Sequence, residues 1–401
     1  MDSITNIKGT KDILPDDFNL WEKSSQIIKS HFKNYGYTEM KTPTIEKANL
    51  FLRSIGEETD ILGKEMYLWK DKNGESIALR PELTAPIVRS FIQHNIANNN
   101  AITRISYFDT AFRRERPQKG RQRQFYQFGI EAFGSEFPEQ DAEVIAIAYN
   151  IYNKFGIKDI SVKINSLGSL ESKQKFSKII SKSLESYKNL LEPNEQKKLV
   201  NNPMRLFDSK DKTTQEILQK YAPKMFDFIS EDDKKHFDTL QNILTKMNIP
   251  FIFDQSLVRG LDYYTRTAFE IVSKNIGAQD ALCGGGRYDN LVETLGGKST
   301  PAVGFAAGFE RLLLLLNNDK NNFKIDVYLI LIGEKTISTG CKVANDIRNN
   351  LKNIKVVTET CRRSLKSQIK YANQLQTKYT IIIGENELNQ QEVTIKNMAN
   401  G

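Results

Sequence analysis

The alternation of apolar and polar residues between residues 108 and 132 predicts two strands joined by a basic loop. Phe108 and Phe112 alternate with more polar residues before the loop, and every second residue from Tyr126 to Ala132 is apolar after it. Period-two alternation is typical of a strand with one buried face. The pattern predicts one antiparallel hairpin whose opposite face carries four residues: Arg113, Gln127, Gly129 and Glu131.

The hairpin's polar face offers a cation for phosphate, an amide, and a carboxylate for an N–H-bearing ligand. A solvated hairpin with surface ion pairs is the alternative interpretation. Gly129 lies between Gln127 and Glu131. A glycine there predicts room for a molecule on the sheet, which favours the ligand-binding interpretation.

Other periodic patterns continue through the first 316 residues. Apolar spacings of three and four predict helices over 18–32 and 145–155. Residues 41–45, with Pro43 inside, indicate an edge strand or an extended segment, and short apolar patterns predict strands at 77–79 and 160–164. Lys-, Glu- and Gln-rich helical patterns then fill residues 169–250 before strand-like sequence returns. Strands, inserted helices and further strands in this order predict an α+β fold with a largely antiparallel sheet.

The last 77 positions have a different pattern. Residues 325–332 are apolar on both faces, as in a buried parallel strand, and helices and strands alternate after them. This predicts a small α/β domain, which lacks the glycine fingerprint of dinucleotide binding. We therefore expect four segments: 1–168 as the first part of the main domain, 169–250 as a helical insertion, 251–320 as the second part, and 325–401 as the α/β domain.

Composition narrows the class of protein. The 401 residues are 39% hydrophobic and 26% charged with a formal charge of +8, which permits a polyanionic partner. Three scattered cysteines and three scattered histidines predict no disulfide framework, no metal site built from His or Cys, and a reduced, cytoplasmic setting. Residues 1–11 lack the apolar core of a signal peptide, and no apolar run is long enough to span a bilayer.

Two segments combine charge with hydroxyl or phenol groups. Glu82 and Thr84 follow a predicted strand and suit an ammonium ligand, although the start of a helix is the more usual setting for such a pair. Residues 257–265 hold Arg259 with Tyr263 and Tyr264. Consecutive tyrosines on a strand face opposite sides, so we expect one in the core and one free to contact a ligand.

Two further segments combine glycines with arginines. The run 283–289 contains Gly284, Gly285 and Gly286, which allow close approach of a ligand but also serve in ordinary turns. Residues 304–311 lead a strand into a helix with Arg311 in its first turn, where anions are favoured. The alternative there is a core helix with a surface pair between Arg311 and its neighbour Glu310.

Together these segments supply three arginines for phosphate charge: Arg113, Arg259 and Arg311. Three arginines suit in-line attack at a nucleotide phosphate, a reaction that is accelerated mainly by positioning of the reactants and by stabilisation of charge. The Gly-x-x-x-x-Gly-Lys-Ser/Thr loop is absent from the sequence, which excludes the P-loop route.

The segments resemble the class II aminoacyl-tRNA synthetases, and within them the histidyl-tRNA synthetases. The resemblance covers nearly the whole chain and rests on seven segments: 9–12, 35–46 (motif 1), 80–84, 112–134 (motif 2), 257–265 and 281–290 (two signatures of the histidine enzymes), and 304–315 (motif 3). It implies an antiparallel catalytic domain with an anticodon-binding α/β domain at residues 325–401. It also implies a ligase that forms histidyl-adenylate from histidine and ATP with Mg²⁺, and transfers the histidyl group to tRNA(His).

The resemblance also implies individual roles. Arg113 and Arg259 would hold the α-phosphate from two sides and Arg311 the γ-phosphate. The residues implied for histidine are Glu82, Thr84, Gln127, Glu131, Tyr263, Tyr264, Gly286 and Tyr288. Those implied for tRNA are Gln118, Lys119 and Arg121 at the acceptor stem, and Arg362 and Arg363 at the anticodon. A cytoplasmic homodimer is implied by motif 1.

Three alternatives of other classes remain. A regulatory paralogue of the ATP phosphoribosyltransferase type generally lacks the C-terminal domain and the second arginine, and both are present here as residues 325–401 and Arg259. A degenerate RNA-binding module is disfavoured by the intact three arginines. A synthetase for another amino acid is disfavoured because Glu131 and Tyr264 suit an imidazole.

Overall fold

The computed structural model describes residues 3–55, 64–99, 101–116, 118, 120–209, 211–273, 281–316 and 325–400. It divides into two compact units. The first comprises Met1–Asp12 and Trp21–Asn317, and the second Ile13–Leu20 and Asn318–Gly401. In the described ranges no helix is long and apolar enough to cross a membrane.

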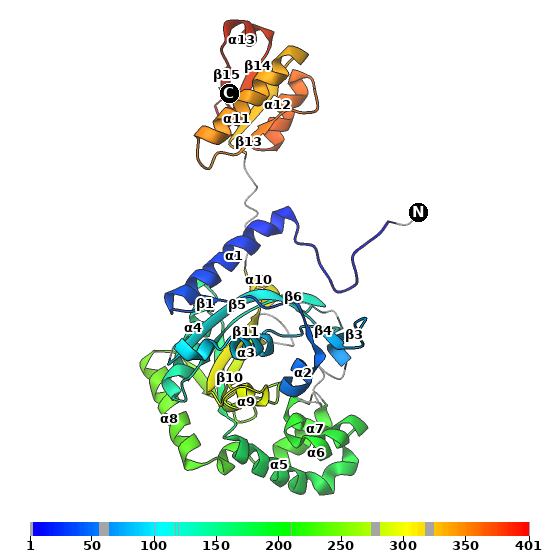
Figure 1. The fold of residues 1–401 in the computed structure, drawn as a ribbon, viewed down its shortest axis with the longest axis vertical. Helices are drawn as coiled ribbons and strands as arrows, with labels where there is room; N and C mark the ends of the chain where they lie inside the picture. Colours follow the sequence, from blue (N-terminus) through cyan, green and yellow to red (C-terminus); the bar gives the residue numbers. More distant parts are fainter. Residues whose placement is uncertain are drawn as a thin grey trace. The chain divides into compact units, whose positions relative to one another are not determined.

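An eight-stranded sheet organises the first unit, in the order β1-β5-β6-β11-β10-β9-β7-β8 (Figure 1). Neighbouring strands of the sheet pair antiparallel except at its two edges, where β1 pairs in parallel with β5 and β8 pairs in parallel with β7. The strands are β1 Thr38–Glu39, β5 Thr103–Phe112, β6 Gln124–Phe133, β7 Ser161–Ser166, β8 Phe251–Phe253, β9 Thr265–Val272, β10 Ala281–Arg287 and β11 Ala302–Gly308.

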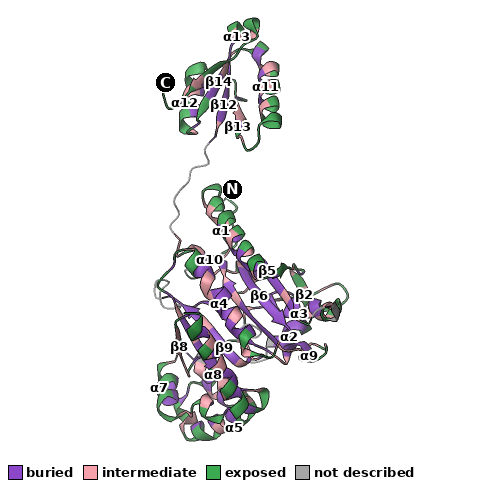
Figure 2. Cartoon of the chain, turned by 90° about the vertical axis from the view of Figure 1, so that its left-hand side faces the viewer, coloured by how far each residue is buried: buried purple, intermediate pink, exposed green. Residues whose placement is uncertain are grey.

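One face of this sheet is covered by helices. These are α1 (Pro15–Asn34), α4 (Pro138–Lys154), α8 (Glu231–Lys246) and the short α10 (Phe309–Leu313). Alternate strand residues such as Phe128 and Ile130 point into this apolar core and are fully buried. The central strands such as β5 and β6 therefore appear mostly buried in Figure 2. The opposite face of the central strands carries the polar residues of the hairpin.

Smaller elements cover that opposite face. They are α2 (Ala48–Ile55), α3 (Thr84–Gln93), α9 (Leu291–Thr294) and a three-stranded sheet of β2 (Ile45–Lys47), β3 (Tyr67–Lys70) and β4 (Ser76–Leu79) in the order β2-β4-β3. The helix α3 packs through Leu83, Ile87 and Val88 onto the sheet. The start of α3 therefore lies directly over the polar hairpin face.

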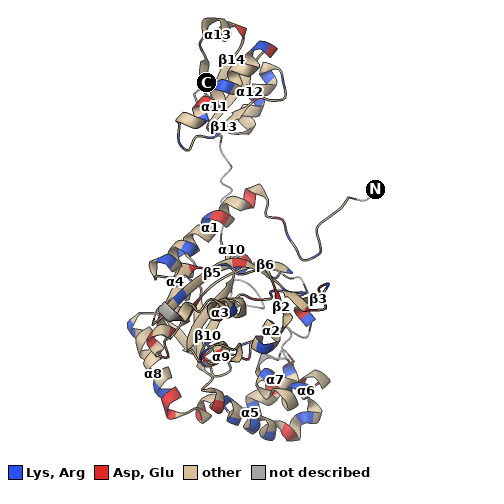
Figure 3. Ribbon diagram, viewed as in Figure 1, with Lys and Arg blue, Asp and Glu red and all other residues tan. Residues whose placement is uncertain are grey.

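Residues 170–246 form a helical segment with its own apolar cluster. It contains α5 (Leu170–Leu184), α6 (Pro193–Asn201), α7 (Lys212–Tyr221) and α8, with 3₁₀ turns η3 (Glu185–Leu190), η4 (Pro203–Asp208) and η5 (Met225–Phe228) between them. Pro193 starts α6, because proline is accepted in the first turn of a helix but not in its interior. Lysines recur along the outer side of α5 (Figure 3).

The second unit contains a four-stranded sheet in the order β13-β12-β14-β15. Its central strand β12 (Val327–Leu331) is buried along its whole length and pairs in parallel with β13 (Val356–Thr358) and β14 (Tyr379–Ile383), while β15 (Thr394–Asn397) adds antiparallel. The helices are α11 (Ile337–Asn350), α12 (Leu365–Gln374) and α13 (Glu385–Gln390). The expected α+β main fold and small α/β domain are confirmed.

Of the two alternatives for 41–45, the edge strand is wrong for residues 41–44, since β2 begins only at Ile45. Residues between β1 and β2 are not in a strand, and the carbonyl oxygens of Thr42 and Pro43 accept hydrogen bonds from the buried Arg80 guanidinium at 2.7 and 3.3 Å. Pro43 has no N–H to give to a ladder. The segment is therefore held by a side chain, which the apolar pattern does not reveal.

Candidate active site

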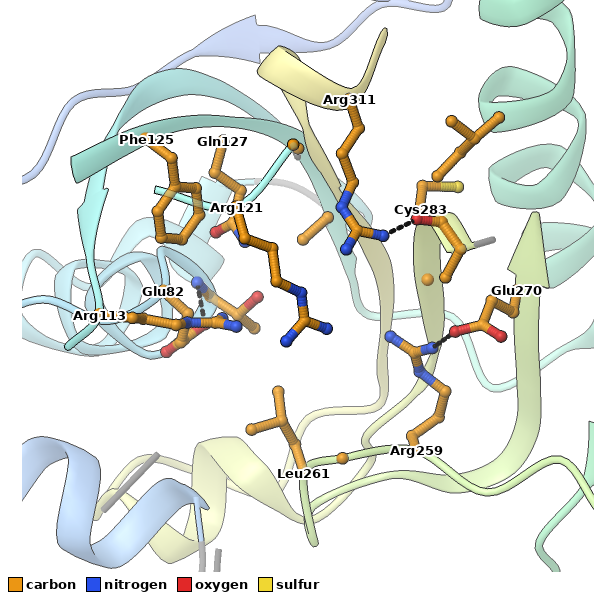
Figure 4. Close-up of a pocket in the computed structure, with 18 of the residues that line it drawn as sticks. Glu82, Arg113, Arg121, Phe125, Gln127, Arg259, Leu261, Glu270, Cys283 and Arg311 are labelled. Atoms are coloured by element: carbon orange, nitrogen blue, oxygen red, sulfur yellow. Dashed lines mark hydrogen bonds and ion pairs between the residues drawn. The ribbon is translucent and has the colours of Figure 1, made fainter. Parts of the chain in front are cut away.

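A cavity of about 320 Å³ opens over the polar face of the sheet (Figure 4). Its walls come from the β5–β6 hairpin, the start of α3, the loop 257–264, strands β9 and β10, and the β11–α10 junction. Arg113, Arg259 and Arg311, about 200 positions apart at the extremes, all line it. The sequence-based hypothesis required this convergence.

Each of the three arginines is held by a neighbour. Arg113 donates from Nε to the carbonyl of Pro81 at 2.8 Å, and Arg259 forms an ion pair with Glu270 at 2.7 Å. Arg311 donates to the carbonyl of Ala281. These contacts fix the guanidinium groups before any ligand arrives, which is the condition for electrostatic preorganisation.

The cavity also contains a fourth arginine. The guanidinium of Arg121 points into the same space as those of Arg259 and Arg311 (Figure 4) and pairs with Glu115 at 2.8 Å. Burial and then the neighbouring charge of Arg121 lower the pKa of Arg311. Cations that repel one another in a cavity gain most from an anion placed between them, so the cavity suits a polyphosphate.

Glu82, Thr84 and Gln127 meet at one end of the cavity. The Glu82 carboxylate accepts from the N–H groups of Thr84 and Ala85 at 2.6 and 2.9 Å, and the Gln127 amide oxygen accepts from the N–H of Leu83 at 3.1 Å. A helix does begin in this segment, at Thr84, but Glu82 precedes its first turn and was expected within it. Glu82 is nonetheless positioned beside the cavity, and burial raises its pKa.

Glu131 lies one contact below the cavity lining. Its carboxylate is 1% exposed and accepts hydrogen bonds from the hydroxyls of Thr84 at 2.7 Å, Tyr107 at 3.1 Å and Tyr288. Burial raises the pKa of Glu131 to about 8, although the three hydroxyls oppose the shift. Of the residues implied for histidine, Glu131, Gly286 and Tyr288 lie outside the cavity lining, and the other five line it.

The two tyrosines do not face opposite sides as expected. Tyr263 and Tyr264 both line the cavity, and their ring centroids are 4.7 Å apart. The reason is that they precede β9, which begins at Thr265, and lie in a turn where the alternation of a strand does not apply. Both side chains are almost fully buried.

The glycines accommodate side chains of the protein itself. A Cβ at Gly129 would lie 2.4 Å from the Tyr107 hydroxyl and 2.1 Å from a backbone oxygen, so the expected room for a ligand there is wrong. A Cβ at Gly284 would lie 2.0 Å from the Arg259 guanidinium. Gly286 likewise abuts the Thr267 carbonyl. Backbone oxygens therefore exclude a Cβ at Gly129 and Gly286, whereas at Gly284 the far end of a side chain occupies the space.

The residues implied for tRNA are spread over several places. Gln118 is exposed at the hairpin tip and pairs with Arg121 in an isolated bridge, while Lys119 lies outside the described residues. In the second unit Arg362 is exposed and pairs with Glu334 at 3.2 Å. Arg363 instead pairs with Glu359 at 2.8 Å and stacks on the Tyr371 ring at 4.1 Å.

Sequence reasoning missed three carboxylates of the cavity, Glu115, Glu270 and Glu310. The interpretation of Glu310 as a surface partner of Arg311 gives way to a half-buried position, where its carboxylate accepts from the Tyr126 N–H at 3.0 Å. Burial raises the pKa of Glu310 to about 7. Strand alternation in β9 places Glu270 on the face opposite the buried Phe269 and Ile271. The sequence pattern could therefore have predicted Glu270 on the cavity face.

The whole chain matches known families and proteins. Residues 9–312 match the family model described as histidyl-tRNA synthetase, and residues 326–401 match the anticodon binding domain. The chain is 43% identical to a histidine–tRNA ligase of Clostridioides difficile over 98% of its length and 94% of that protein. It is 42% identical to one of Ruthia magnifica over 98% and 93%. A crystal structure of apo histidyl-tRNA synthetase from S. aureus has a TM-score of 0.82 and 36% identity, covering 100% of this chain and 96% of that one.

Proposed function

Because the chain belongs to the histidyl-tRNA synthetase family, we propose that the cavity bounded by Arg113, Arg259 and Arg311 is where histidine and ATP react. The protein is a class II histidine–tRNA ligase. It activates histidine with ATP to histidyl-adenylate and transfers the histidyl group to the 3′ end of tRNA(His). The convergence of the three arginines in one cavity is the observation that supports the assignment.

In the first step, a carboxylate oxygen of histidine attacks the α-phosphorus, and the bond to the leaving pyrophosphate breaks. We assign Arg113 and Arg259 to the α-phosphate, since they line the cavity from opposite walls, and Arg311 to the γ-phosphate. Arg121 joins Arg311 at that end. Negative charge builds on the phosphate oxygens as the reaction proceeds. The fixed guanidinium groups therefore stabilise the transition state more than they stabilise the bound ATP.

The histidine-binding end is assigned to the group around Glu82. Its carboxylate, with Thr84 and Gln127, offers acceptors for the α-ammonium. Glu131 accepts from the ring N–H of histidine through a rearrangement of the hydroxyl contacts that it now makes. Tyr264 and Tyr263 close the ring pocket, with Tyr288 and Gly286 beneath it. A pocket built from such buried polar groups rejects apolar rivals because they leave those groups unpaired.

Mg²⁺ fits the chemistry of the cavity. Magnesium is usually held by substrate phosphates with one or two carboxylates, and Glu270 and Glu310 line the wall near Arg311. When bound there, it would neutralise charge on the phosphates. The described residues contain no cluster of three or more His, Cys, Asp or Glu able to hold a metal by themselves. This is consistent with a metal that depends on ATP for most of its ligands.

Partner contacts extend the proposal. Gln118, Lys119 and Arg121 on the hairpin loop would meet the acceptor stem, with Arg121 shared between tRNA and ATP. Residues 325–401 would bind the anticodon near Arg362 and Arg363, since unpaired bases are where sequence-specific RNA readout occurs.

We further propose 169–250 as an inserted unit within a catalytic domain formed by 1–168 and 251–320. ATP and tRNA as substrates suit a cytoplasmic enzyme.

A homodimer accounts for exposed apolar side chains around motif 1. Ile45 is 51% exposed, Leu68 50% and Trp69 40%, all on the small sheet β2-β4-β3. Side chains of this size gathered on one sheet are typical of an interface with another protein. Light scattering should give a mass near twice 45.9 kDa. A monomeric mass at micromolar concentration would contradict the dimer.

ATP–pyrophosphate exchange tests the assignment of the cavity. We expect exchange with histidine and not with the other nineteen amino acids. Arg259→Ala should lower kcat by roughly 10²- to 10³-fold, the cost of removing one preorganised donor, with the thermal unfolding midpoint retained. Arg53→Ala changes an exposed arginine on α2 that does not line the cavity and serves as the control. Equal activity of the two variants would refute the role of Arg259.

A further inference from the structure

The loop 257–264 separates two cavities. Arg259 and Leu261 line the reaction cavity and also line a second cavity of about 260 Å³, whose other wall is formed by α5, the end of α6 and η4. Arg259 therefore stands on a segment that the first unit's sheet contacts on one side and the inserted helices contact on the other.

The inserted helices hold this loop through partly buried polar contacts. The Lys173 ammonium, on α5, donates to the carbonyl oxygens of Asp262 and Tyr264 at 2.9 and 2.7 Å. Arg205, on η4, pairs with the Asp262 carboxylate at 2.7 Å and donates to the carbonyl of Arg259 itself at 3.3 Å. The Asn202 amide donates to the second Asp262 oxygen at 3.1 Å. Three side chains of the insertion thus fix three backbone carbonyls and one carboxylate of the loop.

The base of α5 is itself fixed to the sheet. The Asp233 carboxylate, which is 1% exposed, accepts from the N–H of Ser169 at 3.0 Å and pairs with Arg266 of β9 at 3.1 Å. The Ser169 side chain caps α5 by accepting from the Ser172 N–H. Lys173, one turn into the helix, is therefore carried on an anchored support. Because α5 is anchored, the Lys173 ammonium has a fixed position, and so do the loop carbonyls to which it donates.

We propose that Lys173 and Arg205 are positioning residues for Arg259, so that the helical insertion sets the place of the guanidinium used in histidine activation. The inference rests on the role proposed above for Arg259. A loop residue has no ladder of hydrogen bonds to define it, and a displacement of about 1 Å at a catalytic group costs about 10²-fold in rate. The contacts from α5 and η4 fix the position of the loop that carries Arg259.

The environment of Lys173 indicates that its ammonium group is needed for hydrogen bonding to the loop. Burial lowers its pKa to about 8, Asp262 opposes this shift, and Arg205 adds to it. An ammonium that loses solvation is retained because it satisfies two carbonyls that would otherwise lack donors. The stem of the side chain alone would fill the space without making either bond. Methionine at this position therefore separates packing from hydrogen bonding.

The test is a double-mutant cycle in the full-length chain, measured by histidine-dependent ATP–pyrophosphate exchange. Lys173→Met should lower kcat about tenfold or more when Arg259 is present, and less than about threefold in the R259A background, because the lysine acts through that arginine. Lys173→Arg, which keeps a cation and donors, should recover part of the loss. Lys178→Met changes an exposed lysine on the same helix and should leave exchange unchanged.

The outcomes separate this inference from the proposed function. No effect of R259A would refute the role of Arg259 and the inference with it. An effect of Lys173→Met that is equal in both backgrounds, or absent in both, would refute the inference alone. If Lys173→Met does not fold, Asp262→Asn replaces it in the cycle, since the Asp262 side chain is 35% exposed and its loss leaves the packing intact. It should show the same non-additivity with a smaller loss.

Discussion

A buried carboxylate such as Glu131 serves function at a cost to folding. Its pKa rises from 4.5 to about 8 on folding because burial disfavours the charged form. For a group whose folded pKa is raised, the contribution to stability is fully present below about pH 4.5 and is lost as the pH rises through about 8. The native enzyme near pH 8 therefore carries a carboxylate that the fold would stabilise better as a neutral group.

Glu131→Gln should change stability and activity in opposite directions. As the pH rises from 5 to 8.5, the wild type should lose up to about 4 kcal/mol of unfolding free energy that the variant keeps, because glutamine stays neutral. Its kcat/KM for histidine should fall about 30-fold through loss of a charge-assisted hydrogen bond, with KM for ATP unchanged. Urea unfolding across that pH range and exchange kinetics measure both effects. A stability difference independent of pH would contradict the shifted pKa.

Residue positions on one regular element could be predicted from the sequence, and contacts between elements could not. Strand alternation correctly placed Gln127 and Glu131 on the face opposite Phe128. It did not show that Glu131 lies below the cavity, because its partners Tyr107 and Tyr288 are 24 and 157 positions away. The same limit explains the error at Gly129, where the occupying group comes from the neighbouring strand.

At the scale of an element, β10 is a strand whose glycines make space for different kinds of neighbour. At Gly284 a Cβ would meet the far end of the Arg259 side chain at 2.0 Å. At Gly285 it would meet the carbonyl oxygen of Gly304 at 2.3 Å. A flexible guanidinium can move aside at little cost in packing, whereas backbone of the paired strand cannot.

Two alanine substitutions on β10 should therefore have different consequences. Gly284→Ala should lower kcat of exchange about 10- to 100-fold by displacing Arg259, with the unfolding midpoint nearly unchanged. Gly285→Ala should destabilise the first unit by about 1–3 kcal/mol through overpacking. Thermal unfolding and exchange kinetics of both variants give the comparison. If Gly284→Ala keeps full exchange, the position of Arg259 over β10 is not the one used in catalysis.

Elements with a clear period were predicted well, and elements defined by side-chain contacts were not. The helix predicted at 145–155 overlaps α4 and the strand predicted at 325–332 contains β12, since each is determined by burial of its own apolar residues. The segment 41–45 depends on the Arg80 guanidinium, and the turn at Tyr263 depends on the Lys173 ammonium. No local pattern encodes a donor that arrives from a distant part of the chain.

At the scale of the molecule, the proposed reaction cavity and the anticodon binding domain belong to different compact units. The cavity that we propose for histidine and ATP is lined wholly by residues of the first unit, and the matched anticodon binding domain lies in the second. The sequence predicted two neighbouring arginines as equal tRNA contacts in the second unit. In the structure Arg363 is paired with Glu359, whose carboxylate is 1% exposed, while Arg362 is 71% exposed. Only one of them has a guanidinium that is mainly in solvent.

Charge reversal at Arg362 should therefore affect tRNA alone. Its pair with Glu334 is exposed on both sides and contributes little to stability, so Arg362→Glu should raise KM for tRNA several-fold and reduce the salt slope by about one. Histidine-dependent exchange should stay unchanged, because the cavity is in the other unit. Arg363→Ala should instead destabilise the second unit by about 1–3 kcal/mol, since Glu359 loses its partner.

Aminoacylation kinetics at two salt concentrations distinguish these cases, with Lys342→Glu on α11 as an exposed control of equal charge change. A loss of tRNA affinity that is the same for Lys342→Glu and Arg362→Glu would mean that net charge, and not the position of Arg362, governs binding. A fall in exchange for Arg362→Glu would mean that the two units are coupled during histidine activation. Unchanged exchange with impaired charging is the outcome that a division of substrates between units requires.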